Sequence, residues 1–239
     1  MSSWIEIDGL RVEVVKKDIK HLYVGVYPPE GRVRVAAPSR MGDEPIRMAV
    51  LSRLPWIRRQ RRQYVEQERQ GLREYVSRES HYYLGDRYLL DVVYREGPSR
   101  VRVRGTRIIE LAVPPGSDRG FRERRMLDWY RWELRAIVPP IIASKAKLLG
   151  LSEPSWGIKR MRTRWGTCSV EEGRIWINSE LIKKPRECIE YIVAHELVHL
   201  IEKNHTEPFT AIMDKAMPKW RAIKELLNCA PLAYENWKY

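Results

Sequence analysis

The first forty residues alternate between apolar and polar positions. Glycines and prolines interrupt the alternation, and the apolar positions are Ile5, Ile7, Val12, Val14, Leu22, Val24, Val26, Val33 and Val35. A spacing of two places these side chains on one face of a strand. The pattern therefore predicts several short strands joined by turns.

A helical spacing replaces this alternation from about Glu44 to Tyr75. Apolar residues three or four positions apart predict one buried helix face, formed by Ile46, Val50, Leu51, Leu54 and Ile57. Pro55 lies inside the stretch and is expected to kink or restart the helix. A second strand-rich block follows from Tyr82 to Val113, and a Pro-Pro-Gly sequence ends it.

The second half of the chain has a mainly helical pattern. Apolar residues keep helical steps from Leu127 to Leu148, where Pro139 and Pro140 predict a kink or break. Two short strands are expected at residues 157–168 and 174–178, before a helix from Pro185 to about Lys203. We therefore predict an α+β protein. A β-rich domain with a long helix, residues 1–118, precedes a mainly helical domain with a short β-hairpin, residues 119–239.

The composition is that of a soluble globular protein, since 44% of the 239 residues are hydrophobic and 31% are charged. The longest uncharged apolar run, residues 136–144, is too short for a membrane span and contains two prolines. The N-terminus lacks an apolar secretory core, and the three cysteines are far apart in the sequence. These features predict a cytoplasmic protein in a reducing compartment, with no membrane partner.

The most informative stretch is YIVAHELVHLIEKNH, residues 191–205. His195 and His199 are four positions apart, so both imidazoles lie on one helix face and can bind a single ion. Glu196 lies about 100° around the helix, where it can reach a water on that ion. His205 is expected to return as the third ligand, after the helix ends near Asn204.

Three protein ligands with one open position are typical of catalytic zinc sites, whereas structural sites close all four positions. Three histidines also suit other divalent transition metals. A carboxylate often accepts a hydrogen bond from the ring nitrogen that does not bind the metal, and so orients the imidazole. Glu202 and Glu207 are the candidates for this role. Cys168 is expected to be a small buried residue and not a nucleophile, because it has no base of its own.

Three segments resemble the YgjP-like family of metal-dependent hydrolases, which is distantly similar to SprT and other small zinc peptidases. The segments are residues 162–169 (RTRWGTCS), residues 177–197, which end in His-Glu-Leu, and residues 204–209 (NHTEPF). Thr167 replaces the family's usual serine, and Thr210 stands where the family usually has tryptophan.

The resemblance implies a zincin-like metallohydrolase domain that binds Zn²⁺ through His195, His199 and His205, with Glu196 as the general base. The first hypothesis is therefore a metallopeptidase, in which an activated water attacks a peptide bond. An exposed edge of the strand at 174–178 would pair with an extended peptide substrate. The expected substrate contacts are Arg162, Arg164, Trp165 and Asn178.

Two alternatives remain open at this stage. Arg160, Arg162 and Arg164 would share one strand face and bind phosphates, and the resemblance includes nucleoside triphosphate (UTP-type) pyrophosphatase activity. The same three arginines can equally form a solvent-exposed basic face of the strand that binds no ligand. The net charge of +13 and two basic clusters with interleaved aromatic residues, 58–62 and 119–125, allow a nucleic-acid-binding module. These aromatic residues also have the spacing of a buried helix face, so they can equally belong to the hydrophobic core.

Overall fold

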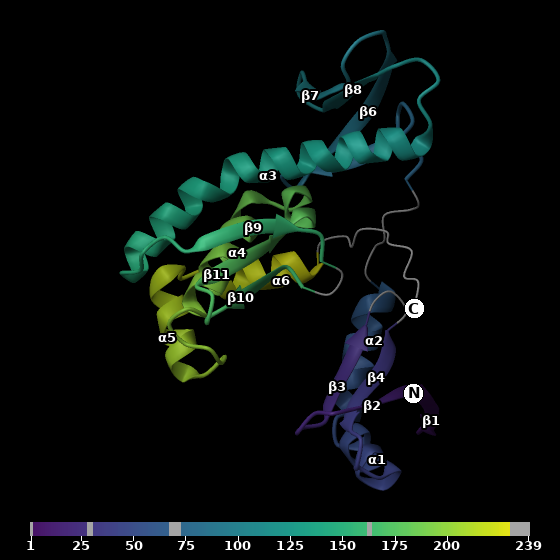
Figure 1. The fold of residues 1–239 in the computed structure, drawn as a ribbon, viewed down its shortest axis with the longest axis vertical. Coiled ribbons are helices and arrows are strands. Elements are labelled where there is room, and N and C mark those ends of the chain that lie inside the picture. The colour runs from purple at the N-terminus through teal and green to yellow at the C-terminus, as the bar shows by residue number, and fades with distance from the viewer. Residues whose placement is uncertain (1, 28–30, 67–72, 162–163, 230–239) are drawn as a thin grey trace. The chain divides into compact units, whose positions relative to one another are not determined.

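The computed structural model describes residues 2–27, 31–66, 73–161 and 164–229. The chain folds into two compact units that divide between residues 69 and 70. Both units mix helices and strands (Figure 1), so the predicted α+β class is confirmed. No helix in the described ranges is long and apolar enough to cross a membrane.

The first unit is a four-stranded sheet with two helices. Its strands are β1 (Ser2–Ile7), β2 (Leu10–Lys17), β3 (Tyr23–Tyr27) and β4 (Arg32–Pro38), in the order β1-β2-β4-β3. The β2–β4 pair is parallel and the other two pairs are antiparallel. The alternating valines of β2 and β4 form a core with Ile46, Val50 and Ile57 of the helices.

The predicted helix over residues 44–75 is two helices, α1 (Asp43–Leu51) and α2 (Leu54–Glu66). Pro55 lies in the first turn of α2, so it restarts the helix as expected, because its missing N–H would be unpaired there in any case. Residues 73–76 are not helical, and residues 67–72 lie outside the described ranges.

The second unit begins with another four-stranded sheet, of order β5-β6-β8-β7. Its strands are β5 (Ser80–Tyr83), β6 (Asp86–Tyr94), β7 (Arg100–Arg104) and β8 (Ile108–Val113). Leu90, Ile109 and Leu111 share one core with Met126 and Leu134 of the following helix. The unit division therefore differs from the boundary expected at 118/119, because this sheet buries its apolar face against that helix.

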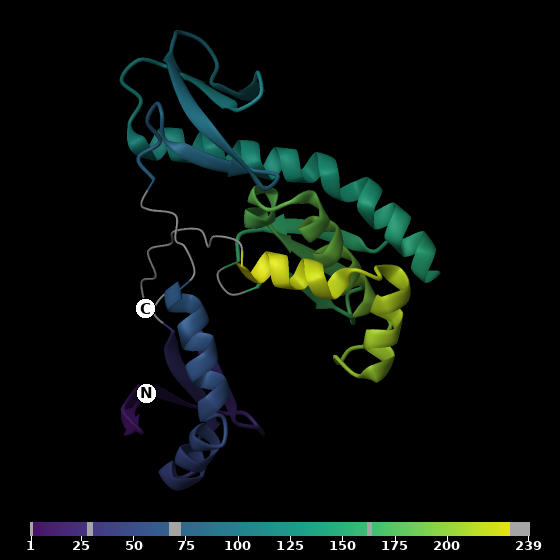
Figure 2. The ribbon, with the colours of Figure 1, turned by 180° about the vertical axis from the view of Figure 1, so that it is seen from behind.

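The long helix α3 (Arg119–Leu149) runs without interruption through Pro139 and Pro140. Its axis bends along its length in both views (Figures 1 and 2). Asp118 caps its first turn, and Gly150 ends it in the left-handed conformation. Val138, Ile141 and Ile142 next to the prolines are buried, so packing holds the helix together. The predicted break is therefore wrong, and the helix bends along its length instead.

A three-stranded sheet and three helices complete the unit. The strands are β9 (Ser155–Lys159), β10 (Gly166–Ser169) and β11 (Arg174–Asn178), and the helices are α4 (Arg186–Val198), α5 (Glu207–Ala216) and α6 (Trp220–Cys229). A short 3-10 helix, η1 (Ser179–Lys183), links β11 to α4. β10 and β11 form the expected hairpin, and β9 pairs parallel with β11.

Two expectations about these strands are wrong. The strand predicted over residues 157–168 is two strands, β9 and β10, so Arg160 and Arg164 lie outside strands and do not share a strand face. The order β10-β11-β9 also places β11 in the centre. The strand β11 therefore has no free edge for an extended peptide, because it already pairs on both sides, and the edge strands are β10 and β9.

A buried histidine in this unit predicts how stability depends on pH. His81 is 3% exposed, and burial, followed by the nearby Arg73 and Lys183, lowers its pKa from 6.5 to about 3. Between about pH 6.5 and pH 3, His81 is protonated in the unfolded chain but stays neutral in the folded chain. Folding stability should therefore fall between pH 6.5 and pH 3, by at most about 1.4 kcal/mol per pH unit from this group.

Urea unfolding at a series of pH values tests this prediction. The variant His81→Gln should flatten the acid dependence over this range, whereas the matched change of the exposed His21, His21→Gln, should leave it unchanged. Equal slopes for the wild type and His81→Gln would contradict the assignment.

Candidate metal centre

The helix α4 carries His195 and Glu196, and His199 caps its C-terminal end. Its buried face includes Ile189, Val193 and Leu197, and it packs against α3, α5, α6 and the β9–β11 sheet. The helix ends at Val198, five residues before the expected end at Lys203. Hydrogen bonds from the amides of residues 200 and 201 to carbonyls three residues back tighten the chain here.

His199 is the C-terminal cap of α4 and keeps right-handed helical dihedrals, so its side chain remains on the face of His195. The chain then turns, and His205 precedes α5. Asn204 does not have the left-handed backbone that we expected, since it is not among the described residues with positive φ. The reversal instead uses the tight turn after Val198 and a bond from the Thr206 amide to the Asn204 carbonyl.

The three imidazoles converge. The Nε2 atom of His195 lies 3.2 Å from Nε2 of His199 and 3.1 Å from Nε2 of His205. Tetrahedral ligands with bonds of about 2.0–2.1 Å are separated by about 3.3 Å, close to these distances. The donor atoms of all three residues lie within 4.8 Å of one another, so they could hold a single metal ion.

Phe209 of α5 packs against all three imidazoles. Its ring is 2% exposed, and its centroid lies 5.1, 4.8 and 4.7 Å from those of His195, His199 and His205. Phe209 was part of the sequence resemblance, but its packing against all three imidazoles was not predicted. Its position in the first turn of α5 also ties His205 to the buried core.

The predicted orienting carboxylates are not found around the imidazoles. The backbone carbonyl of Glu202, and not its carboxylate, lies 3.2 Å from Nδ1 of His199. The Glu202 carboxylate instead accepts a hydrogen bond from the amide of Asn204. Glu207 is exposed and makes no hydrogen bond to a ligand imidazole among the described residues, and Nδ1 of His195 is buried without a partner there.

Burial favours the neutral forms of His195 and His205. It is the main reason that the pKa of His195 falls to about 3, with the neighbouring imidazoles and Lys224 acting in the same direction. Burial, His199 and Lys224 also lower the pKa of His205. Neutral imidazoles have free lone pairs, which metal binding requires.

Glu196 lies against the strand β10 and is 5% exposed. A Cβ atom on Gly166 would come within 2.5 Å of its Oε1 atom, so only glycine leaves room for this carboxylate. Burial raises the pKa of Glu196 to about 8, and the Arg164 guanidinium opposes this rise. A cation bound by the histidines would act in the same direction as Arg164. Gly166 was part of the sequence resemblance, but its contact with Glu196 was not predicted, because this contact joins residues that are 30 positions apart in the sequence.

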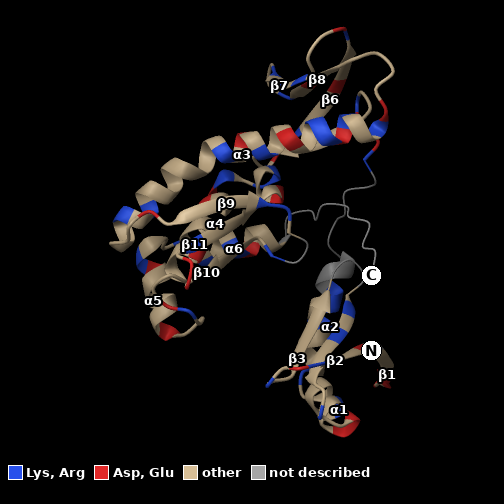
Figure 3. Cartoon of the chain, viewed as in Figure 1, with Lys and Arg blue, Asp and Glu red and all other residues tan. Residues whose placement is uncertain are grey.

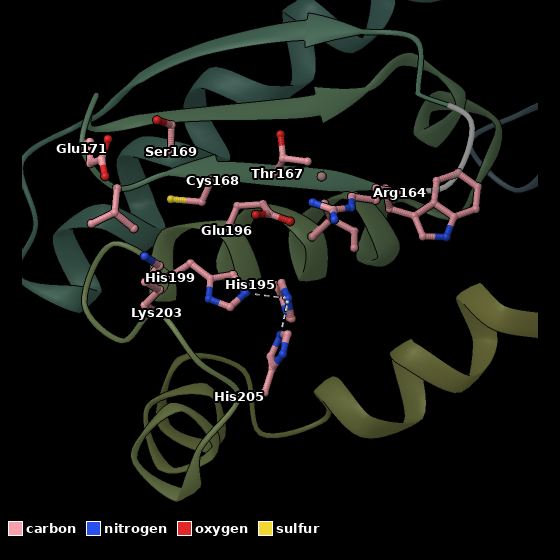
Figure 4. Close-up of a pocket in the computed structure, with 14 residues that line it drawn as sticks. Arg164, Thr167, Cys168, Ser169, Glu171, His195, Glu196, His199, Lys203 and His205 are labelled. Carbon is pink, nitrogen blue, oxygen red and sulfur yellow. Dashed lines mark hydrogen bonds between the residues drawn. The ribbon is translucent and has the colours of Figure 1, made fainter. Parts of the chain in front are cut away.

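A cavity of about 710 Å³ joins these groups (Figure 4). The residues that line it come from β10 and the segments beside it, from α4 and from the turn before α5, and include Arg164, Trp165, Gly166, Thr167, Cys168, Ser169, His195, Glu196, His199, Lys203 and His205. Two of the expected substrate contacts, Arg164 and Trp165, therefore line the cavity. Arg162 lies outside the described residues.

Asn178, the fourth expected contact, does not line the cavity. It is 3% exposed, and its Nδ2 atom donates to the carbonyls of Met161 (2.8 Å) and Arg164 (2.7 Å). Its own amide donates to the carbonyl of Trp165. Asn178 therefore holds the Arg164–Trp165 segment instead of offering its side chain to a substrate.

Cys168 lines the cavity beside Glu196, but its thiol is not activated. Burial and the Glu196 carboxylate raise its pKa to about 11. A thiol with a raised pKa is a poor nucleophile at neutral pH, which supports the expectation that Cys168 is not a nucleophile. The side chain is half-buried at the cavity and not buried as expected.

The basic cluster at residues 119–125 is largely engaged within the protein, although Figure 3 shows many basic residues along the start of α3. Arg122 is 9% exposed and donates to backbone carbonyls, and Arg119 and Arg125 pair with Glu123 and Asp128. Trp129 is buried. These contacts give the cluster a structural role and do not favour a nucleic-acid surface.

Comparison with known proteins gives a family and two structural likenesses. No curated protein matches the chain significantly. Solved metallopeptidase zymogens, abylysin of Pyrococcus abyssi and jannalysin of Methanocaldococcus jannaschii, are each 22% identical to this chain. Abylysin aligns over 38% of this chain and 90% of its own (TM-score 0.36), and jannalysin over 39% and 92% (TM-score 0.33). The model of the YgjP-like metallopeptidase domain matches residues 20–230, and the chain therefore belongs to the YgjP-like family.

Proposed function

We propose that this protein is a zinc-dependent peptidase that uses His195, His199 and His205 as metal ligands and Glu196 as general base. The observation that carries the proposal is the convergence of the three imidazoles beside a carboxylate in the same cavity. The Nε2 atom of His195 lies 3.2 Å and 3.1 Å from the Nε2 atoms of His199 and His205. Zinc bound there would supply an activated water and polarise the scissile carbonyl. Membership of a metallopeptidase-domain family supports this assignment.

Glu196 performs the proton transfers in this proposal. Its carboxylate accepts a proton from the attacking water as the water oxygen bonds to the carbonyl carbon. It then donates that proton to the leaving nitrogen as the C–N bond breaks, which releases a carboxylic acid and an amine. The close contact with Gly166 fixes the carboxylate against β10, so it keeps one orientation during both transfers.

The strand β10 supports a peptide as the substrate. It is an edge strand of its sheet, and residues 166–169 all line the cavity next to Glu196. An extended peptide can add to such an edge through backbone hydrogen bonds. The substrate backbone would then pass directly above Glu196 and the histidines.

The two described arginines, Arg160 and Arg164, are not arranged as expected for a nucleotide substrate. Arg160 lies 3.8 Å from the buried carboxylate of Glu180, and it does not line the cavity, whereas Arg164 does. These two arginines therefore do not form the common phosphate-binding face predicted from their alternation. The geometry favours the peptide hypothesis over phosphoanhydride hydrolysis.

The first prediction from the proposed function concerns the general base. Glu196→Gln should retain zinc but lower kcat on a casein-derived peptide by about 10²–10⁴-fold, because the amide cannot accept the proton. Glu190→Gln on the same helix, a residue paired with Arg186, is the matched control and should retain activity. Zinc content measured by mass spectrometry and peptide cleavage measured by chromatography give both readouts. Full activity of Glu196→Gln would refute the assigned role.

The second prediction concerns the ligand set. The wild type should bind one zinc per chain, and His205→Ala should bind zinc far more weakly, because two imidazoles replace three. His21→Ala removes an exposed histidine and should bind zinc normally. Calorimetric zinc titration measures both, and equal affinity in His205→Ala and the wild type would rule out this ligand.

The third prediction concerns the contact between β10 and α4. Gly166→Ala should displace the Glu196 carboxylate and reduce kcat without loss of zinc, because the new Cβ overlaps Oε1. Gly173→Ala is the control for a glycine substitution near this strand. Gly173 lies in the turn between β10 and β11 with open space around it, and its positive φ means that alanine adds backbone strain only. An unchanged kcat in Gly166→Ala would show that the carboxylate does not need this position.

A further inference from the structure

The proposed reaction leaves one charge without an assigned partner from the protein. Addition of water to a peptide carbonyl moves the π electrons onto the carbonyl oxygen, which becomes an oxyanion. Enzymes stabilise such oxyanions with hydrogen-bond donors that are already in place. The donor has to line the cavity, reach the space near Glu196 and have donor capacity that no other protein group occupies.

Arg164 meets these conditions among the described residues. It lines the cavity and is exposed, and its charge acts on the Glu196 carboxylate. In Figure 4 its guanidinium points toward the same part of the cavity as Glu196, whereas Lys203, the other cation that lines the cavity, lies on the side of His199. No hydrogen bond or ion pair occupies the Arg164 guanidinium within the described part of the chain. Its neighbour Arg160, in contrast, lies by Glu180.

The backbone that carries Arg164 is fixed although its side chain is exposed. The side-chain amide of Asn178 donates to the carbonyl of Arg164. The backbone amide of Asn178 donates to the carbonyl of Trp165. The Asn178 side chain also bonds both the amide and the carbonyl of Met161. One buried residue therefore holds the chain on both sides of residues 162–163.

We infer that the Arg164 guanidinium is the catalytic group that stabilises the oxyanion, and that Asn178 is a positioning residue that holds Arg164 over the cavity. This inference rests on the proposed peptidase function. Arginine suits this task because its planar fork stays charged and can donate two parallel hydrogen bonds to an anionic oxygen. The stabilisation is made only after water has added, so it should lower the barrier and not the substrate dissociation constant.

The test compares Arg164→Met, Arg164→Lys and Arg164→Gln with the wild type, on one casein-derived peptide that the wild type cleaves. Arg164→Met and Arg164→Gln should lower kcat by about 10²–10³-fold with little change in KM. Arg164→Lys should recover part of the rate, since it keeps the charge without the fork. Arg186→Met removes an exposed arginine from the start of α4 and should keep the wild-type rate.

A binding measurement separates the oxyanion role from general damage. The phosphinic analogue of the same peptide carries a tetrahedral anion, and calorimetry should show it bound more weakly by Arg164→Met by the same factor as kcat/KM falls. Zinc content and the melting temperature should not change. Asn178→Ala should lower kcat at temperatures well below its melting point, and this loss should largely disappear in the Arg164→Met background.

The outcomes distinguish the two levels of the proposal. A wild type that cleaves no peptide with zinc bound would refute the proposed function itself. If the wild type cleaves peptides and Arg164→Met keeps the wild-type kcat or changes only KM, the oxyanion role is overturned and the peptidase function stands. Additive losses for Asn178→Ala and Arg164→Met would overturn the positioning role of Asn178.

Discussion

The site depends on the burial of α4 within the second unit. The helix packs against α3, α5, α6 and the β9–β11 sheet, and most of its residues are buried. Its polar residues at the cavity therefore cannot move independently of the core. Because His195 and Glu196 are adjacent on this rigid helix, the ligand and the general base keep a fixed relation, which functional groups need for efficient chemistry.

Three other segments complete the cavity, and each is held by a specific contact. Phe209 packs under the imidazoles and brings the turn with His205 to the end of α4. Gly166 lets β10 approach Glu196 without a side chain between them. Asn178 fixes the segment with Arg164 through buried hydrogen bonds, which are costly to leave unmade. A small number of local contacts thus assembles groups that lie far apart in the sequence.

Several polar groups act through their backbones or through packing rather than through their charges. Glu202 presents a carbonyl to His199, Arg122 is buried and bonds carbonyls, and Asn178 bonds the chain instead of the cavity. Residue type alone suggested carboxylate, phosphate and substrate contacts for these positions. Which atom of a residue is used depends on the direction of the chain around it, and sequence spacing does not fix that direction when the chain leaves regular helices or strands.

The sequence by itself determined the mixed α+β class and most strands and helices, because these follow from local periodicity. The same periodicity placed His195 and Glu196 on one helix, with His199 on the same face at its end. Only the tertiary structure decided the rest. It divided the chain at residues 69 and 70, kept α3 continuous through two prolines and made β10 an edge strand in place of β11. Each of these depends on which apolar face finds a partner elsewhere in the chain, and such long-range packing overrides local propensity.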